Sequence, residues 1–193
     1  MKSEMVKLEH KGLKFKMSRP TLAEIALASV FAQASPANAP QAIAVPAIGE
    51  YWPGQGGING GFVAPRGNVP AHYLIVADKD IGEHKWGRYG EESEAISKWD
   101  GKANTDALIA AGGHPAAEAA RAYTVDGHSD FDLPAAAQLY QAWVHDLIAK
   151  GGYWSSSQRS ALTAFTMGFG GGTQYSGGKS YELRVRPVRR FFI

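Results

Sequence analysis

The chain has 193 residues, a formal net charge of +2 at pH 7 and 20% charged residues, which is enough for one domain plus an appendage. It contains no cysteine, and this excludes disulfides, thiolate metal sites and thiol catalysis. The nearly balanced charge lacks the strong positive field of a dedicated nucleic-acid-binding protein, so we expect no nucleic-acid partner.

Residues 1–20 form a basic arm in which apolar and polar side chains alternate, as in the stretch Val6-Lys7-Leu8-Glu9. A period of two residues predicts a strand or an extended arm. Two roles are open for this arm: it is solvated, or it docks onto the acidic surface of a partner.

A short helix is predicted over residues 21–33, because Thr21 and Glu24 have the spacing of a capping box. The three prolines within residues 35–46 predict an extended linker. Ala37-Asn38-Ala39 imitates a signal-peptide cleavage site, but Glu24 interrupts the apolar run before it. That run is also too short to cross a membrane, so we expect neither a cleaved signal nor a membrane span. The sequence thus divides into an attachment segment, 1–47, and a globular domain, 48–193.

The globular domain opens with an aromatic and glycine-rich stretch, after which strand patterns dominate both ends. A hairpin is predicted from strands at 62–64 and 72–76 and the turn-rich segment between them. Short strands are predicted again from residue 152 to the end, with a flexible hairpin connection over 168–178.

Between these strand regions the pattern indicates loops and helices. Residues 78–101 are polar and predict mostly loop. Helices are predicted over 102–110 and over 115–123, with Gly112-Gly113-His114 as the break between them.

A third helix is predicted from Pro134 to Ala149, where proline suits the first turn and Tyr140 belongs to a broad apolar face.

The segment 130–134 leads into this helix. Its Phe131 and Leu133 are predicted to face the core, and Asp130 or Asp132 is predicted to accept hydrogen bonds from the free N–H groups at the helix start. The hydroxyls of the serine run 155–157 are expected to satisfy loop backbone.

Four segments carry a family resemblance by their order and spacing. They are GKANTDALIA (101–110), DGHSDFDLPAAAQL (126–139), GGYWSSSQ (151–158) and RVRPVRRF (184–191). Together they resemble the Lcl-type C-terminal domain family of the C-type-lectin-like superfamily. The opening YWPGQGGINGG (51–61) resembles a form common among bacteriophage-encoded members. The resemblance covers residues 48–193.

The resemblance implies an α+β, C-type-lectin-like fold: two helices beside a twisted, mainly antiparallel sheet with long loops. The calcium motifs of sugar-binding C-type lectins are missing, the nearest string being Trp99-Asp100-Gly101. The cysteine chemistry of the related sulfatase-activating enzymes is excluded by the composition. We therefore expect no cofactor and no metal.

No catalytic constellation is evident. Gly127-His128-Ser129-Asp130-Phe131 lacks the final glycine of a nucleophile elbow, and Gly178-Lys179-Ser180 lacks the earlier glycine of a phosphate loop. His114 and His128 are expected to be solvated or locally hydrogen-bonded. Five aspartates are candidate oxygen ligands for an ion, but helix caps and turns explain them better: Asp100, Asp106, Asp126, Asp130 and Asp132.

The last strand carries a cluster of four arginines: Arg184, Arg186, Arg189 and Arg190. Two interpretations are open, namely pairing with loop carboxylates and stacking on nucleobases. The first is favoured, with Leu183, Val185 and Val188 on the opposite, buried side of the strand.

The sequence predicts a non-enzymatic bacteriophage virion protein, a tail-fibre or baseplate adhesin that binds a host-cell-surface glycan or protein. The alternative is a decoration or cementing protein of the capsid or tail, and an enzyme is a third hypothesis. We expect the N-terminal arm to bind other virion proteins and the chain to form a homo-oligomer, a trimer. The predicted ligand contacts are Trp154, Gln158, Arg159, Gln174, Tyr175 and Lys179, although Trp154 equally suits a core position.

Overall fold

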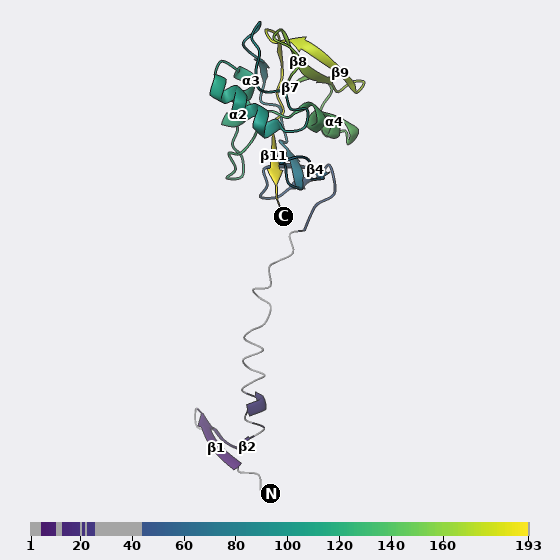
Figure 1. Cartoon of the computed structure of the whole chain (residues 1–193). Helices are drawn as coiled ribbons and strands as arrows, with labels where there is room; N and C mark the ends of the chain where they lie inside the picture. Colours follow the sequence, from purple (N-terminus) through teal and green to yellow (C-terminus); the bar gives the residue numbers. More distant parts are fainter. Residues whose placement is uncertain (1–4, 11–12, 20, 22, 26–43, 193) are drawn as a thin grey trace. The chain divides into compact units, whose positions relative to one another are not determined.

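The computed structural model describes residues 5–10, 13–19, 21, 23–25 and 44–192 (Figure 1). The chain divides into two compact units, Met1–Ala44 and Val45–Ile193, and each is described by itself. Among the described residues, no helix is both long and apolar enough to span a bilayer.

The N-terminal unit contains an antiparallel hairpin of β1 (Met5–His10) and β2 (Leu13–Ser18). The alternating pattern that predicted a strand is thus confirmed. Helical residues follow from Arg19, and the Ser18 hydroxyl accepts a hydrogen bond from the Thr21 N–H at 3.4 Å. Ser18, and not Thr21, is therefore the capping residue. Most of the predicted helix (residues 26–33) and of the linker (35–43) lies outside the described residues.

The unit Val45–Ile193 is mixed α+β, with two sheets in its described residues. The orders are β6-β10-β7-β8-β9 and β11-β5-β4-β3, and every pairing is antiparallel except the parallel pair β10–β7. The strands are β3 (Tyr51–Trp52), β4 (Gly57–Val63), β5 (His72–Val76), β6 (Glu83–Lys85), β7 (Gly152–Gln158), β8 (Thr163–Gly168), β9 (Thr173–Gly178), β10 (Glu182–Arg184) and β11 (Val188–Phe191). The predicted early hairpin is confirmed as β4–β5, although β4 begins at Gly57, five residues before the predicted strand.

Three helices accompany the sheets, one more than the resemblance implies: α2 (Gly101–Ala111), α3 (Pro115–Ala122) and α4 (Ala136–Val144). The predictions for α2 and α3 are confirmed to within a residue at each end. α4 is shorter than the predicted helix, which was placed over 134–149. It ends early because Asp146 adopts a left-handed conformation, with φ of 52°, that an α-helix does not accommodate.

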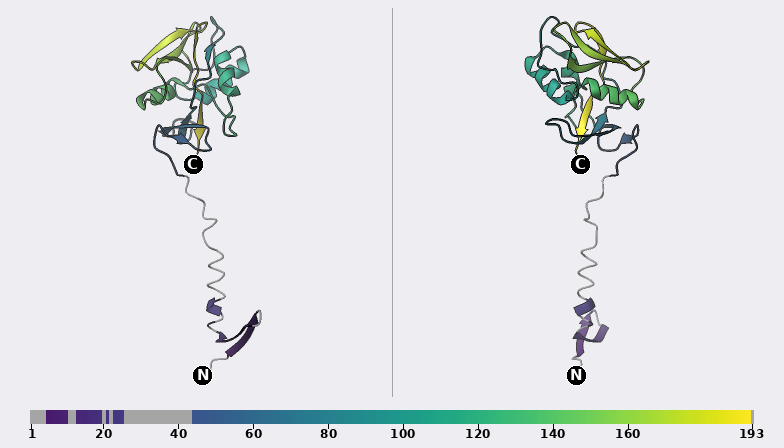
Figure 2. Two further views of the ribbon diagram at one scale, coloured as in Figure 1. Left: turned by 180° about the vertical axis from the view of Figure 1, so that it is seen from behind. Right: turned by 45° about the vertical axis from the view of Figure 1, so that its right-hand side comes forward.

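β7 lies at the centre of the core and is covered on both faces. Tyr153 packs with Leu139 and Met167, whereas the next residue, Trp154, packs with Leu108 and other apolar side chains on the opposite face. Figures 1 and 2 show α2 and α3 on one side of β7 and α4 on the other. Because successive side chains of a strand alternate, covering both faces buries every residue from Tyr153 to Gln158.

Two local predictions need correction. Residues 173–178, predicted as part of a flexible connection, form strand β9, and only the short turn before it connects the hairpin. The polar stretch 78–101 is mostly loop, as predicted, and β6 is a short strand of three residues within it. The predicted last strand is split into β10 and β11, which belong to different sheets. Pro187 lies between them and has no N–H to continue a ladder.

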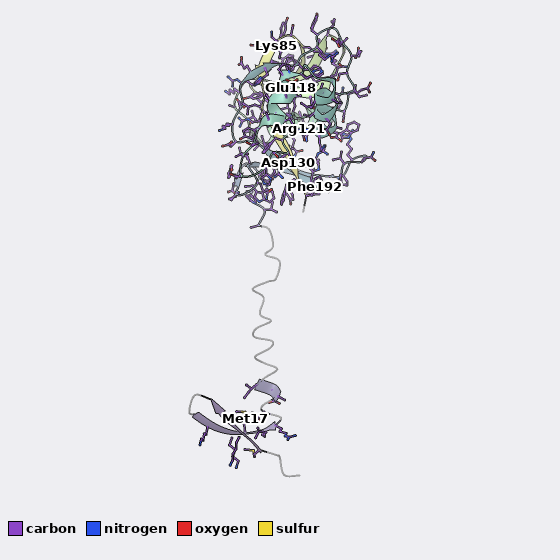
Figure 3. All side chains as sticks on the ribbon, turned by 90° about the vertical axis from the view of Figure 1, so that its left-hand side faces the viewer. Met17, Lys85, Glu118, Arg121, Asp130 and Phe192 are labelled. Carbon is purple, nitrogen blue, oxygen red and sulfur yellow. The ribbon has the colours of Figure 1, made fainter. Side chains whose placement is uncertain are left out.

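The arginines of the last segment pair with loop carboxylates, as the favoured interpretation predicted. Arg186 Nε lies 2.7 Å from an Asp80 oxygen, and Arg189 Nε lies 2.7 Å from an Asp130 oxygen. Arg190 pairs with Asp100. Asp130, labelled in Figure 3, is one of the carboxylates used in this way. Arg186 was predicted to face away from the core, but its side chain is buried. Burial is tolerated because the guanidinium pairs with the Asp80 carboxylate.

The Asp-Phe-Asp-Leu-Pro segment enters α4 through an ion pair of a similar kind. Phe131 and Leu133 are fully buried, as predicted. The Asp132 carboxylate accepts a hydrogen bond from Arg121 Nη2 at 2.6 Å, and the same nitrogen donates to Asp106 at 2.7 Å. Asp130 or Asp132 was predicted to accept hydrogen bonds at the start of α4. Asp132 instead accepts a hydrogen bond from the Arg121 guanidinium on α3.

Candidate functional site

Three of the six predicted contact residues are interior. Trp154 is fully buried and donates from Nε1 to the His84 carbonyl at 2.8 Å. Lys179 is also fully buried; its ammonium donates to the Glu91 carbonyl and to Gln158 Oε1, both at 2.6 Å. Burial lowers the pKa of Lys179. These side chains bind the protein's own groups, so a ligand on the surface does not contact Trp154, Gln158 or Lys179.

The other three predicted residues are exposed, and Tyr175 lies on the face of β9 opposite to the face that Gln174 and the Arg159 contact, Ser176, share. Gln174 and Tyr175 are consecutive in β9, so their side chains lie on opposite faces. Arg159 donates to the Ser176 hydroxyl at 2.9 Å. Ser176 lines a separate hollow of about 380 Å³, together with Tyr89, Leu162, Thr163, Gly178, Ser180 and Tyr181.

A surface that combines aromatic and polar side chains lies at the start of α4, and we call it the α4 groove. It consists of two hollows that share Ala137. The first, of about 310 Å³, is lined by Lys98, Ala136, Ala137, Tyr140, Phe165 and Gln174. The second, of about 220 Å³, is lined by Val63, Ala64, Arg66, Val69, His72, Trp99, Ala137, Gln138 and Gln141.

The first turn of α4 is fixed by side chains and loops around it. The Ala136 N–H donates to the Ser157 hydroxyl at 3.1 Å, and that hydroxyl donates to the Ser97 carbonyl at 2.7 Å. The Ala137 N–H donates to the Lys98 carbonyl at 2.8 Å. The prediction that the serine run satisfies loop backbone is thereby confirmed. These bonds hold the floor of the groove rigidly and leave these two helix N–H groups no capacity for a ligand.

Two cations flank the groove, each over an aromatic ring. The Arg66 guanidinium lies 4.0 Å from the centre of the Trp99 ring. The Lys98 ammonium lies 4.3 Å from the centre of the Phe165 ring and donates to the Gln158 carbonyl at 3.2 Å. Burial lowers the pKa of Lys98. Of the residues that line the two hollows, none is an aspartate or a glutamate.

Two polar side chains of the groove are not used by the fold. The Tyr140 ring is 52% exposed, and neither its hydroxyl nor the Gln174 amide has a hydrogen-bond partner among the described residues. Gln141 is held in place because its Nε2 donates to the Gly60 carbonyl at 2.7 Å. The groove thus offers rings, amides and cations on a fixed backbone.

Two histidines are buried: His72 at the bottom of the second hollow and His114 in the core. Burial favours the neutral form of both imidazoles. The Nδ1 of His72 lies 2.8 Å from the Pro70 carbonyl, and the Nδ1 of His114 lies 3.0 Å from the Trp86 carbonyl. Burial lowers the pKa of both below the ordinary value of 6.5, although these backbone hydrogen bonds oppose it. Nearby charges also change these pKa values. The pKa of His72 is lowered by Arg190 and raised by Asp100. The pKa of His114 is lowered by Lys179 and Arg88 and raised by Glu118.

These two histidines make the fold sensitive to acid. Below pH 6.5 the unfolded chain binds protons that the folded chain does not, so the free energy of unfolding falls as the pH decreases towards the folded-state pKa values. Each such group contributes at most about 1.4 kcal/mol per pH unit to this slope, a limit that is reached only where the unfolded and folded forms differ by a whole proton. Urea unfolding between pH 7.5 and 5 measures the slope. We expect His114→Gln to reduce it by about half, whereas replacement of the exposed His145 by Gln leaves it unchanged.

Sequence reasoning missed most of the α4 groove. Arg66, Lys98 and Trp99 lie in segments predicted as turn or loop, and Tyr140 was assigned to the apolar face of a helix. These residues come from separate parts of the chain, so no local spacing marks them as a set. Of the predicted contacts, only Gln174 belongs to the groove.

Comparison with known proteins gives no assignment: no protein-family model matches the sequence, and no curated protein matches it either.

Proposed function

We propose that the chain is a non-enzymatic bacteriophage virion protein, a tail-fibre or baseplate adhesin, whose domain 48–193 binds the host surface. The observation that carries this proposal is the α4 groove, where exposed rings and unused polar groups lie on a rigid support. Recognition surfaces combine aromatic anchors with adaptable hydrogen-bonding side chains in this way.

We further propose that the domain is C-type-lectin-like and belongs with the Lcl-type C-terminal domain family. Two observations support this assignment: the unit is mixed α+β, and the four resembling segments occupy α2, the entry to α4, strand β7 and strands β10 and β11. These segments supply much of the core, including its central strand β7, while most of the groove residues lie outside them.

The N-terminal segment is proposed to attach the protein to the virion and to form a trimer. We expect deletion of residues 1–47 to leave a folded domain whose mass in solution falls from that of a trimer to that of a monomer. The reason is that Val45–Ile193 is a compact unit with a core of its own. Light scattering coupled to size exclusion measures the mass. An unchanged oligomeric state would show that the assembly contacts lie within the domain.

A second function, a decoration or cementing protein, is favoured by one observation. Ala137, Tyr140 and Val144 form an exposed apolar stripe along α4, and such a stripe suits repeated contacts in a protein lattice. Electron cryomicroscopy of virions carrying a tagged chain separates the two functions. We expect the tag at the tips of fibres or on the baseplate. Regular lattice positions would favour decoration, and absence from the particle would contradict both.

A further inference from the structure

We propose that the domain forms an internal isopeptide bond between the side chains of Lys179 and Gln158, with Glu92 as the group that transfers the proton. This inference goes beyond the proposed function and does not depend on it. The fold brings the three residues together from distant segments: Glu92 lies in the loop between β6 and α2, Gln158 ends β7, and Lys179 follows β9. Because the chain has no cysteine, an amide is the kind of covalent cross-link that its composition allows.

The amine and the amide are held in contact. Lys179 Nζ donates one hydrogen bond to Gln158 Oε1 and another to the Glu91 carbonyl, both at 2.6 Å. Since Oε1 is bonded to Cδ, the nitrogen lies beside the carbon that it has to attack, and such proximity lowers the barrier to reaction. The other end of the amide is also fixed, because Gln158 Nε2 donates to Glu92 Oε2 at 2.6 Å and to the Ser93 carbonyl at 3.2 Å.

The surroundings of Lys179 favour the neutral amine, which is the nucleophile. Two other lysine or arginine side chains are buried among the described residues, Arg186 and Arg189, and each of them pairs with an aspartate. The Lys179 ammonium is fully buried but donates to two neutral oxygens. Burial lowers its pKa, although the charges of two nearby glutamates oppose this effect. A lysine in such a site is a better nucleophile at neutral pH than an exposed one.

The reaction balances without any further reactant. The neutral Lys179 Nζ attacks Gln158 Cδ and forms a C–N bond, so that both nitrogens are bonded to one carbon. The Glu92 carboxylate, which already accepts a hydrogen bond from Nε2, takes a proton from Nζ and passes one to Nε2. The Cδ–Nε2 bond then breaks, and ammonia leaves beside Glu92, which is exposed. An amine and an amide thus become an isopeptide bond and ammonia.

The cross-link would fasten one edge of a sheet. In the order β6-β10-β7-β8-β9, strand β9 lies at the edge and pairs only with β8. A bond between residues 158 and 179 closes a loop that contains β8 and β9 and ties its end to the central strand β7. Closing a loop restricts the unfolded chain and so stabilises the fold. In the unreacted alternative, hydrogen bonds alone hold a buried ammonium, and the two states differ in mass.

The mass of the denatured full chain therefore tests the proposal. We expect it to be lower than the mass of the sequence by one molecule of ammonia. Trypsin should release a branched peptide in which residues 151–159 are joined to residues 160–184, uncleaved after Lys179. An unreacted chain gives separate peptides 151–159, 160–179 and 180–184. The full mass, both after purification and after prolonged incubation at pH 7.5, would overturn the proposal, and so would a loss of ammonia without the branched peptide.

Matched variants test the role of Glu92. Glu92→Gln keeps the size of the side chain but cannot accept the proton, so we expect a folded chain with its full mass. Glu94→Gln makes the same change at an exposed glutamate two residues further on, and this variant should lose ammonia as the unsubstituted chain does. Lys179→Met removes the nucleophile and should also keep the full mass. Circular dichroism checks that each variant is folded. If Glu92→Gln loses ammonia as completely as Glu94→Gln, the assignment of proton transfer to Glu92 is wrong.

Discussion

Replacing Trp154 with alanine is expected to lower the free energy of unfolding by about 3–5 kcal/mol. The indole is fully buried on the face of β7 that packs against α2 and α3, and its Nε1–H donates to the His84 carbonyl. The substitution therefore leaves a large cavity and an unpaired carbonyl. Urea unfolding at pH 7.5 measures the change, with the slope on denaturant concentration as a check that the transition stays two-state.

Tyr175→Ala is the matched control, because Tyr175 is also an aromatic residue of this sheet but is 59% exposed. Its effect is expected within about 0.5 kcal/mol, as for ordinary surface substitutions. If Trp154→Ala were as mild as Tyr175→Ala, the indole would not be a core residue, and its predicted role as a ligand contact would have to be restored.

Replacing Arg121 with methionine is expected to lower the free energy of unfolding by about 3 kcal/mol at pH 7. The Asp132 side chain is only 8% exposed, and Arg121 is the cation that pairs with it. Without Arg121 the carboxylate remains charged and buried and keeps only the weaker coulombic attraction of Lys102. Burial already raises the pKa of Asp132, against the effect of Arg121. Loss of the guanidinium raises this pKa further, so protonation at low pH should relieve part of the cost.

The destabilisation by Arg121→Met should consequently be smaller at pH 4.5 than at pH 7, and unfolding at both values tests this sign. Lys102→Met is the control: Lys102 also binds Asp106, but both partners of that pair are about half exposed. Lys102→Met is expected to lower the free energy of unfolding by no more than about 1 kcal/mol. A cost for Arg121→Met that does not depend on pH would mean that lost packing of the long side chain, and not the charge of Asp132, sets the effect.

The arginine pairs also matter for function, because a guanidinium that is paired with an aspartate of the same chain is not available to a ligand. Arg186, Arg189 and Arg190 neutralise aspartates from three different loops and so fix the last strand. Nucleobase stacking by this cluster is thereby disfavoured, since the guanidinium edges are engaged and Arg186 and Arg189 are buried. Arg66 and Lys98, which sequence reasoning did not single out, are the cations that remain for a ligand at the α4 groove.

Much of the local structure was predictable because it depends on short-range pattern. The alternation in the arm predicted the strands of the β1–β2 hairpin, and the breaks at Gly112-Gly113 separated α2 from α3 correctly. The burial of Phe131 and Leu133 followed from their place beside a helix start. The serine run after Trp154 was expected to satisfy backbone groups, and Ser157 does so.

Two of the predicted ligand contacts were wrong because polar residues were assumed to be exposed. Gln158 and Lys179 are polar residues in a glycine-rich and serine-rich region, which ordinarily indicates surface. Both are buried because the chain supplies each with a partner from far along the sequence: Glu92 accepts from Gln158 Nε2 at 2.6 Å, and Gln158 accepts from Lys179. A buried polar group is tolerated when such hydrogen bonds form, and these bonds exist only in the folded chain.

The amino-acid sequence alone determined the absence of thiol chemistry and the position of most helices and strands. These features follow from composition and from periods of two and 3.6 residues, which neighbouring residues carry. The tertiary structure alone decided which face of each strand is covered, and it assembled the α4 groove from residues 63–72, 98–99, 136–141, 165 and 174. Exposure and proximity between distant segments are properties of packing, and no local pattern contains them.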